Sequence, residues 1–147
     1  MPRVTKLLET ALYVDDLARS LDFYKRIFGF ELLETPAGGG GADAAEARLC
    51  PLNLPGRQVL LLFRKGSCTE TAVLPGGTIP PHDASGRSHL AFAVSDDDLS
   101  SWRAFLDAQG IPVEGETEWP KGGTSLYFRD PDGHLLELAT PGIWPTY

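Results

Sequence analysis

Two glutamates and one histidine stand where they could bind one cation. Glu9 and His89 each lie five residues before a valine, at the start of two segments that match each other. Glu137 lies between leucines in the run 134–138, where an ionised carboxylate needs a partner such as a cation. Two carboxylates and an imidazole suit a divalent metal ion. Glu9, His89 and Glu137 are therefore candidate metal ligands, and Glu9 and Glu137 are also candidate catalytic residues.

Each of these residues has an ordinary structural alternative. His89 could be a core histidine bonded to backbone, and Glu9 could be an exposed residue of a strand. Glu137 could pair with an arginine such as Arg48 or Arg129. The residues alone leave these alternatives open.

An internal repeat is what would bring the three side chains together. Residues 9–17 align with residues 89–97 at an offset of 80, matching at an alanine, a valine and an aspartate. In both copies an apolar strand meets an Asp-rich N-cap, whose carboxylates can accept hydrogen bonds from the first N–H groups of a helix. If the two copies are related by a pseudo-twofold axis, Glu9 and His89 approach it from opposite sides and can meet.

The repeat also predicts the fold. In each copy an amphipathic helix ends at a glycine, Gly29 or Gly110, and three strands follow. A β-α-β-β-β unit of this size cannot close its own core, so we expect two units to pair into a curved, open, barrel-like sheet with the helices outside. The expected class is α+β. The expected strands after the helices lie at about 30–34, 45–50, 58–64, 112–118, 124–129 and 135–140.

The expected domain organisation is a single domain, 1–147. Module 1 covers about 5–64 and module 2 about 88–142. Residues 65–87 are rich in Gly, Pro, Ser and Thr, which indicates a long surface connection. Polar residues that face the concave space between paired sheets are then the candidate site.

Composition limits the class of protein. With 147 residues, 42% hydrophobic and 22% charged, the chain is typical of a globular protein. The net charge of −7 without a basic run argues against a nucleic-acid partner. No run reaches the ~18 apolar residues of a membrane span, and no leader is evident, so we expect no membrane partner and a cytoplasmic location. Cys50 and Cys68 lack CxxC spacing and are expected to be reduced thiols.

Nearly the whole chain resembles the vicinal oxygen chelate superfamily, which includes glyoxalase I, bleomycin-resistance proteins, fosfomycin-resistance thiol transferases and extradiol dioxygenases. The superfamily match lies in five stretches. The last contains the Phe-x-Asp-Pro-Asp-Gly-x-x-x-Glu run, which is specific to the superfamily but does not select a reaction. The matching stretches are 12–17, 20–24, 28–30, 89–94 and 128–137.

The resemblance implies a metal site on the first and last strands of each module. These positions map onto Glu9, His89, Glu137 and either Leu60 or Leu61. Glutamate stands where histidine is usual, and the fourth position is apolar where a glyoxalase I would have glutamate. Fosfomycin-resistance enzymes and extradiol dioxygenases use three protein ligands. Such a site leaves roughly three open positions on an octahedral ion for two substrate oxygens and a water.

The register of the last two strands decides which side chains face the site. If 130–134 form a five-residue turn, Tyr127 pairs with Glu137, and Tyr127 and Ser125 face the metal side. A four-residue turn would turn them away. Fosfomycin-resistance enzymes have Ser and Tyr at matching places that contact the phosphonate, which favours the first register. Ser125 and Tyr127 are thus candidate substrate-binding residues, whereas His134 is expected to be exposed.

Three further residues are candidate substrate contacts. His82, in the connection, could lie over the site as a lid, or could simply be solvated. Trp119 could form an aromatic wall and Lys121 a cationic loop over a ligand.

These features predict a divalent-metal-dependent enzyme, of lyase, isomerase or thiol-addition type, acting on a small oxygenated molecule. The metal could be Mn, Mg, Fe, Ni or Zn. One alternative is a metal-free protein that binds an antibiotic or other small molecule, as bleomycin-resistance proteins do. An extradiol-type dioxygenase ranks third, because it normally holds iron with two histidines and one carboxylate. We expect a homodimer, with modules paired within one chain or exchanged between two.

Overall fold

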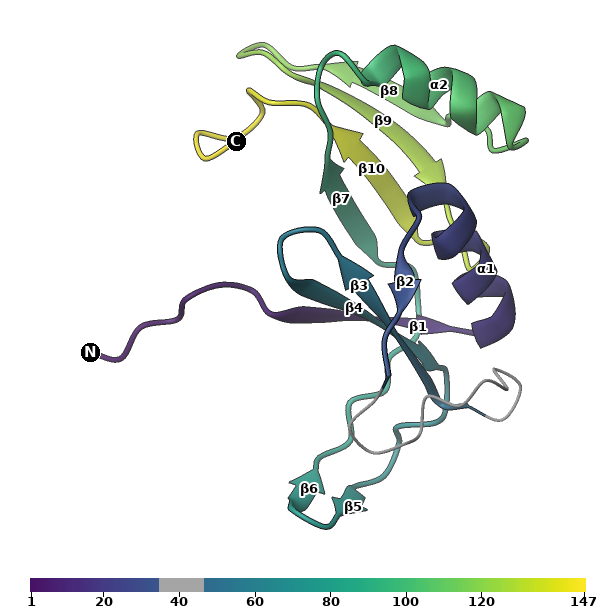
Figure 1. Cartoon of the computed structure of the whole chain (residues 1–147), viewed down its shortest axis with the longest axis vertical. Helices are drawn as coiled ribbons and strands as arrows, with labels where there is room; N and C mark the ends of the chain where they lie inside the picture. The colour runs from purple at the N-terminus through teal and green to yellow at the C-terminus, as the bar shows by residue number, and fades with distance from the viewer. Residues whose placement is uncertain (35–46) are drawn as a thin grey trace. The chain divides into compact units, whose positions relative to one another are not determined.

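The computed structural model describes residues 1–34 and 47–147. It contains two compact units, Met1–Gly86 (unit 1) and Arg87–Tyr147 (unit 2). Figure 1 labels their helices and strands. Unit 2 has the order β-α-β-β-β and unit 1 begins with the same order, so the α+β class predicted from the repeat is confirmed.

Unit 1 contains a four-stranded sheet in the order β1-β4-β3-β2. β1 runs parallel to β4, and the other neighbours are antiparallel. The strand expected at about 45–50 lies four residues later, as β3, and positions 45 and 46 are outside the described residues. The strands are β1 (Glu9–Val14), β2 (Glu31–Leu32), β3 (Leu49–Leu54) and β4 (Gln58–Arg64).

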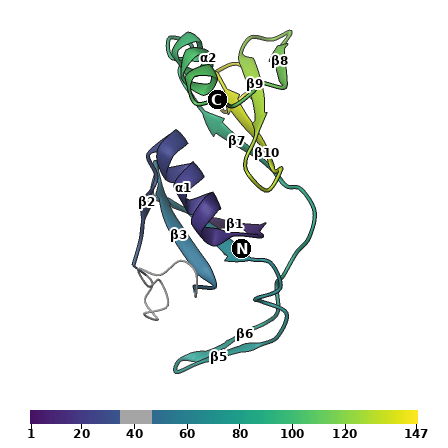
Figure 2. The same cartoon turned by 90° about the vertical axis from the view of Figure 1, so that its right-hand side faces the viewer.

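One face of this sheet is covered by helix α1 (Leu17–Phe28), which contacts β3 and β4 (Figure 2). The Asp16 side chain accepts a hydrogen bond from Arg19 N at 3.0 Å, so the predicted N-cap is present. Gly29 ends the helix in the left-handed region, at φ 68°. The buried helix face carries Leu17, Ser20, Phe23, Tyr24 and Ile27.

Unit 2 repeats this topology in the order β7-β10-β9-β8. Again the first pair is parallel and the others are antiparallel. The strands are β7 (His89–Ala93), β8 (Gly115–Glu118), β9 (Thr124–Arg129) and β10 (Leu135–Ala139), and the helix is α2 (Leu99–Ala108).

The start of α2 differs from the prediction. The Asp98 side chain caps no backbone N–H; it accepts a hydrogen bond from Ser95 Oγ at 2.7 Å. Ser95 Oγ instead accepts from Asp98 N at 3.2 Å. The expectation of an aspartate cap in both copies was therefore wrong for the second, because α2 begins two residues later than the repeat offset of 80 would place it.

The connection 65–87 is mostly exposed, and it contains secondary structure that the sequence did not predict. It contains a hairpin of β5 (Ala72–Leu74) and β6 (Gly77–Ile79). Two hydrogen bonds join the ends of the loop that carries this hairpin. His82 N donates to Cys68 O at 3.1 Å, and Cys68 N donates to the Asp83 carboxylate at 3.0 Å. The hydrogen bond from Cys68 N lowers the pKa of Asp83. A cavity of about 720 Å³ lies between this hairpin loop and residues of β3 and β4.

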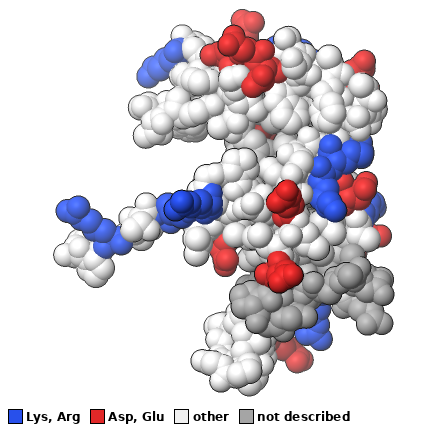
Figure 3. Space-filling view, in the orientation of Figure 1, with Lys and Arg blue, Asp and Glu red and all other residues white. Residues whose placement is uncertain are grey.

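Residues 1–8 precede β1 as an arm whose basic side chains are blue in Figure 3. Lys6 Nζ donates to the carbonyl of Arg57, and Val59 N donates to Leu8 O at 3.0 Å, so the end of the arm is held against unit 1. None of the helices in the described part of the chain is both long and apolar enough to cross a membrane.

Candidate functional site

Polar side chains surround Glu137 on one face of the unit 2 sheet. The Glu137 side chain is only 10% exposed. Its Oε1 accepts hydrogen bonds from Ser125 Oγ at 2.5 Å and from Tyr127 OH at 3.3 Å. Its Oε2 lies 3.1 Å from His89 Nε2. The buried carboxylate is therefore contacted by polar groups from the two strands that flank β10, namely β9 and β7.

Strand register places these groups on one face. Glu137 pairs with Tyr127 across β9 and β10, and Ala139 pairs with Ser125. Leu135, two residues before Glu137, pairs with His89 on β7. Residues at even spacing along neighbouring strands share a face. The five-residue turn register, in which Tyr127 and Ser125 lie with Glu137, is the one that the structure has.

The turn itself is fixed by Asp130, which is buried. Its Oδ1 accepts from Asp132 N at 3.0 Å and from His134 N at 2.8 Å. These two bonds close the turn at residues 130–134, so that Arg129 pairs with Leu135.

His134 is 1% exposed, so the expectation of an exposed residue was wrong. Its Nδ1 accepts a hydrogen bond from Ser88 N at 2.9 Å. Leu135 N also donates to Ser88 O, at 2.8 Å. His134 is buried because the turn brings it against the start of β7, where it holds the residue that precedes His89.

Both ring nitrogens of His89 face acceptors. Nδ1 lies 3.2 Å from the carbonyl oxygen of Leu135, and Nε2 lies 3.1 Å from Oε2 of Glu137. A neutral ring carries one proton and can donate to only one of these two oxygens. With the proton on Nδ1, Nε2 would present a lone pair beside Oε2, which is an arrangement that could hold a metal ion. The backbone alternative for His89 thus accounts for one ring nitrogen only.

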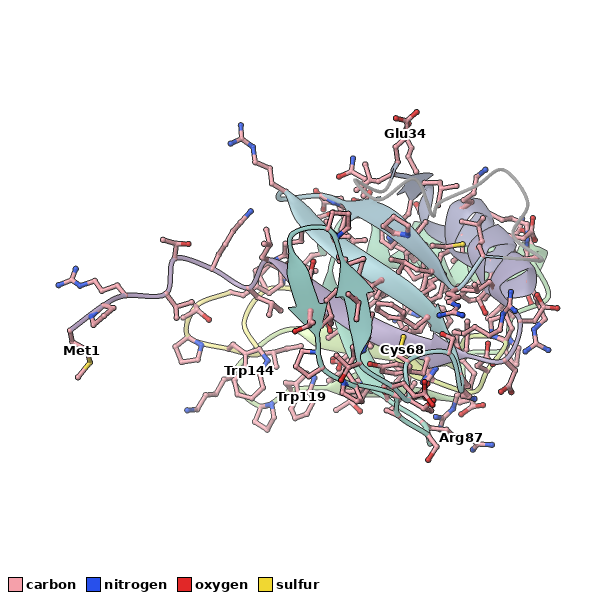
Figure 4. The ribbon with its side chains drawn as sticks, turned by 90° about the horizontal axis from the view of Figure 1, so that it is seen from below. Met1, Glu34, Cys68, Arg87, Trp119 and Trp144 are labelled. Atoms are coloured by element: carbon pink, nitrogen blue, oxygen red, sulfur yellow. The ribbon has the colours of Figure 1, made fainter. Side chains whose placement is uncertain are left out.

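Trp119 and Ser125 continue the cluster toward the loop between β8 and β9. Trp119 Nε1 donates to Ser125 Oγ at 2.8 Å, and Ser125 is fully buried. Lys121 lies in the same loop and is exposed. Figure 4 labels Trp119 on the ribbon of unit 2.

Arg129 is not the partner of Glu137. Its Nε donates to Glu114 at 3.0 Å, and its Nη1 donates to Gly133 O at 3.1 Å. One of the two arginine alternatives proposed from the sequence is therefore wrong, because Arg129 is directed to the β8 side.

In unit 1, Glu9 occupies the register position that corresponds to His89. Glu9 pairs with Val59 as His89 pairs with Leu135, and Ala11 pairs with Leu61 as Ala91 pairs with Glu137. Leu61 rather than Leu60 is thus the counterpart of Glu137. Glu9 is exposed.

His82 also belongs to unit 1. Its Nδ1 lies 2.6 Å from Tyr13 OH, and its ring makes an edge contact with Phe63 at 4.8 Å between centroids. Tyr13 lies on the same face of β1 as Glu9, four residues later. Burial, together with nearby Cys68 and Asp83, raises the pKa of Tyr13, so its phenol stays protonated at neutral pH.

The structure thus brings His89, Glu137, Ser125, Tyr127 and Trp119 together in unit 2 and places Glu9 and His82 on unit 1. Within either unit, the described residues contain no group of three His, Cys, Asp or Glu side chains placed to hold a metal ion. The hydrogen bond from Trp119 to Ser125 was not evident from the sequence, since it depends on how the loop after β8 is placed against β9.

The chain is similar to metallothiol transferases and to lactoylglutathione lyases. Metallothiol transferase FosB from Staphylococcus epidermidis is 30% identical over 131 residues, covering 88% of this chain and 79% of that protein. Lactoylglutathione lyase from Escherichia coli O157:H7 is 30% identical over 139 residues, covering 90% of both. The crystal structure of a lactoylglutathione lyase from Agrobacterium tumefaciens has a TM-score of 0.81 and 32% identity, covering 98% of this chain and 99% of that one.

The family model of the glyoxalases matches residues 6–138, which is most of the chain and includes both strands that carry Glu9 and Glu137. The resemblance stated from the sequence motifs is thereby confirmed. The chain belongs to the Glyoxalase/Bleomycin resistance protein/Dioxygenase superfamily.

Proposed function

We propose that the protein is a divalent-metal-dependent enzyme that acts on a small oxygenated molecule, with Glu9, His89 and Glu137 as the metal ligands. The observation that carries the proposal is the His89 and Glu137 pair, in which an imidazole nitrogen and a carboxylate oxygen lie 3.1 Å apart. A metal-binding histidine characteristically donates its other ring N–H to a backbone carbonyl, and His89 Nδ1 lies 3.2 Å from the carbonyl oxygen of Leu135.

The donor set fits a divalent ion of the harder kind. Two carboxylates and one imidazole would suit Mn²⁺, Mg²⁺, Fe²⁺, Ni²⁺ or Zn²⁺. When bound, such an ion supplies a Lewis acid that polarises two vicinal oxygens of a substrate. The metallothiol transferase and lactoylglutathione lyase relatives support this assignment.

The proposal requires Glu9 of unit 1 to meet His89 and Glu137 of unit 2. Support comes from their equivalent registers, since Glu9 and His89 occupy the same place in two copies of one topology. We infer that the two modules pair as a curved, open sheet, either within one chain or exchanged between the chains of a homodimer.

The chain's own residues have distinct roles in this scheme. Glu137 is buried and held by hydroxyl donors, so it serves chiefly as a ligand. Glu9 is exposed, so its carboxylate is the one that can also accept a proton from a substrate. Tyr127 can donate its hydroxyl proton to a substrate oxygen, and the exposed Lys121 can attract an anionic group.

The charge of the site indicates the kind of substrate. Two carboxylates and a neutral imidazole carry −2 around a +2 ion, so the loaded site is formally neutral. We therefore expect a neutral or singly anionic molecule, such as a hydroxy-carbonyl compound or an epoxide, rather than a nucleotide. His82 and Trp119 remain candidate substrate contacts.

A metal-free binding protein is the alternative function. It is favoured by Leu61, which is apolar at the position equivalent to Glu137 and so removes a fourth ligand. In that case Glu137 would be stabilised by its hydroxyl donors and a protonated His89 alone.

Metal content of the full-length protein, purified without added metal, tests the proposal. We expect one divalent ion per chain in the wild type and loss of that ion in Glu9→Ala, His89→Ala and Glu137→Ala. Glu118→Ala is the matched control, since Glu118 is an exposed carboxylate of β8 in the same unit as Glu137. Equal metal content in all five proteins would contradict the assignment. Metal-loaded protein would then be assayed for thiol addition to an epoxide and for isomerisation of a hydroxy-carbonyl compound.

A further inference from the structure

We propose that Trp119 and Ser125 act as positioning residues that hold Oε1 of Glu137 and leave Oε2 directed toward the metal. This inference rests on the proposed metal site. We call the three residues Trp119, Ser125 and Glu137 the indole relay. Its effect is to choose which carboxylate oxygen is available as a ligand.

The direction of the hydrogen bonds in the relay is fixed by chemistry. The indole N–H of Trp119 is a donor only, so Ser125 Oγ must accept from it, at 2.8 Å. The single hydroxyl proton of Ser125 then goes to Glu137 Oε1, at 2.5 Å. Neither bond can reverse, unlike a chain of hydroxyl groups, so the relay always presents a donor to Oε1.

The two oxygens of Glu137 consequently have different surroundings. Oε1 accepts from Ser125 and from Tyr127, whereas Oε2 faces His89 Nε2. Ser125 is fully buried and the Glu137 side chain is 10% exposed, so water does not readily replace these contacts. Hydrogen bonds to the non-ligating oxygen are the means by which a protein orients a carboxylate for metal binding.

The backbone holds Trp119 in place for this role. Trp119 N donates to Gly123 O and Gly122 N donates to Trp119 O, each at 3.0 Å, which closes the loop. Gly123 has φ 83°, and a Cβ there would lie 2.8 Å from Pro141 O, so the loop packs against the chain after β10 only because residue 123 is glycine.

The relay changes the role expected for Ser125. The resemblance to fosfomycin-resistance enzymes implied a substrate contact, but the only proton of the Ser125 hydroxyl is used by Glu137. Tyr127 has the longer contact to Oε1, 3.3 Å, and is only partly buried, so it is the hydroxyl that can turn to a substrate. Ser125 therefore acts through Glu137 rather than on the substrate.

The relay can be tested in metal-free protein by NMR of the tryptophan indole N–H groups. The chain has three tryptophans, so three signals are expected, assigned with Trp102→Phe, Trp119→Phe and Trp144→Phe. Ser125→Ala and Glu137→Gln should each shift the Trp119 signal, and Ser125→Ala should speed its exchange with solvent. The Trp102 and Trp144 signals should not move. A Trp119 signal that responds to neither variant would refute the relay.

Mn²⁺ affinity of the full chain, measured by EPR of the free ion, tests what the relay does. We expect Trp119→Phe, which keeps an aromatic ring but removes the donor, to weaken Mn²⁺ binding about tenfold. Trp144→Phe is the matched control, because Trp144 is 69% exposed in the same unit, and should leave affinity unchanged. Unchanged affinity in Trp119→Phe would overturn the positioning role. Absence of Mn²⁺ binding by the wild type would refute the proposed function instead. The NMR experiment would still show whether the hydrogen bonds of the relay are present.

Discussion

His89 Nε2 lies 3.1 Å from Glu137 Oε2, while Nδ1 of the same ring faces the carbonyl of Leu135 at 3.2 Å. If the ring donates from Nδ1 to this carbonyl, as metal-binding histidines characteristically do, Nε2 presents its lone pair beside the carboxylate. The two residues lie on the parallel strands β7 and β10. Their contact could not be inferred from the residues that are adjacent to either of them in sequence.

Metal removal should destabilise the protein. An ion that binds only the folded state contributes about 2.7 kcal/mol when present at 100 times its Kd. We expect Tm of the wild type to fall when a chelator replaces Mn²⁺, and Tm of Glu137→Gln to be the same with either. Glu118→Gln should behave as wild type. A chelator effect of equal size in Glu137→Gln would place the ion elsewhere.

Mixing two variants that each lack one proposed metal ligand distinguishes the two ways of pairing modules. If modules are exchanged between chains, Glu9→Ala and His89→Ala subunits refolded together should regain about a quarter of the wild-type metal sites, since a mixed dimer holds one intact site. If modules pair within one chain, each chain lacks a ligand and nothing returns. Metal content and mass by light scattering read the result. A wild-type protein that is monomeric at micromolar concentration would contradict the homodimer.

His134 should be important for stability although it is not a proposed ligand. His134→Ala removes the acceptor for Ser88 N in a buried site, which should lower the free energy of unfolding by about 1–3 kcal/mol. It should also weaken Mn²⁺ binding, because Ser88 precedes His89. His134→Asn can retain an acceptor near the position of Nδ1 and should recover part of both. Urea denaturation measures the first effect, and equal stability of His134→Ala and wild type would contradict it.

The two cysteines should differ in reactivity. Cys50 is 3% exposed, and burial raises the pKa of its thiol, which stays protonated at neutral pH. Because the thiolate is the reacting form, we expect a thiol reagent at pH 8 to modify only Cys68 in the folded protein and both residues after unfolding. Cys68→Ser should then show no rapid reaction. Two thiols with equal rates in the folded protein would contradict this.

Acid should weaken the hydrogen bond between Cys68 N and the Asp83 carboxylate, which joins the two ends of the hairpin loop. The hydrogen bond from Cys68 N lowers the pKa of Asp83 below its ordinary 3.8 in the folded state. This contribution to stability is present above pH 3.8 and is lost as the pH falls through the lower, folded-state pKa. We expect the hydrogen-exchange protection factor of the Cys68 amide to fall below about pH 3.8 in the wild type. Asp83→Asn keeps an acceptor without titrating, so its protection should not vary with pH in this range.

The sequence by itself determined the repeated β-α-β-β-β order, the first helix and the superfamily. These features depend on local patterns: Asp16 caps α1 because its carboxylate reaches Arg19 N three residues on, and Gly29 ends the helix by its own backbone freedom. The same local reasoning failed at α2, which begins two residues later than the repeat offset would place it, and Ser95 rather than an aspartate accepts from Asp98 N there. It also missed the β5 and β6 hairpin, whose three-residue strands are too short to show a period.

Tertiary structure decided the rest of the site. The sequence left the register of β9 and β10 open between two turn lengths, and the Asp130 bonds across the turn select the one that brings Tyr127 and Ser125 to Glu137. Register similarly identifies Leu61 rather than Leu60 as the counterpart of Glu137. Because a shift of one residue moves every side chain of a strand to the opposite face, hydrogen bonds between distant residues determine which side chains surround Glu137.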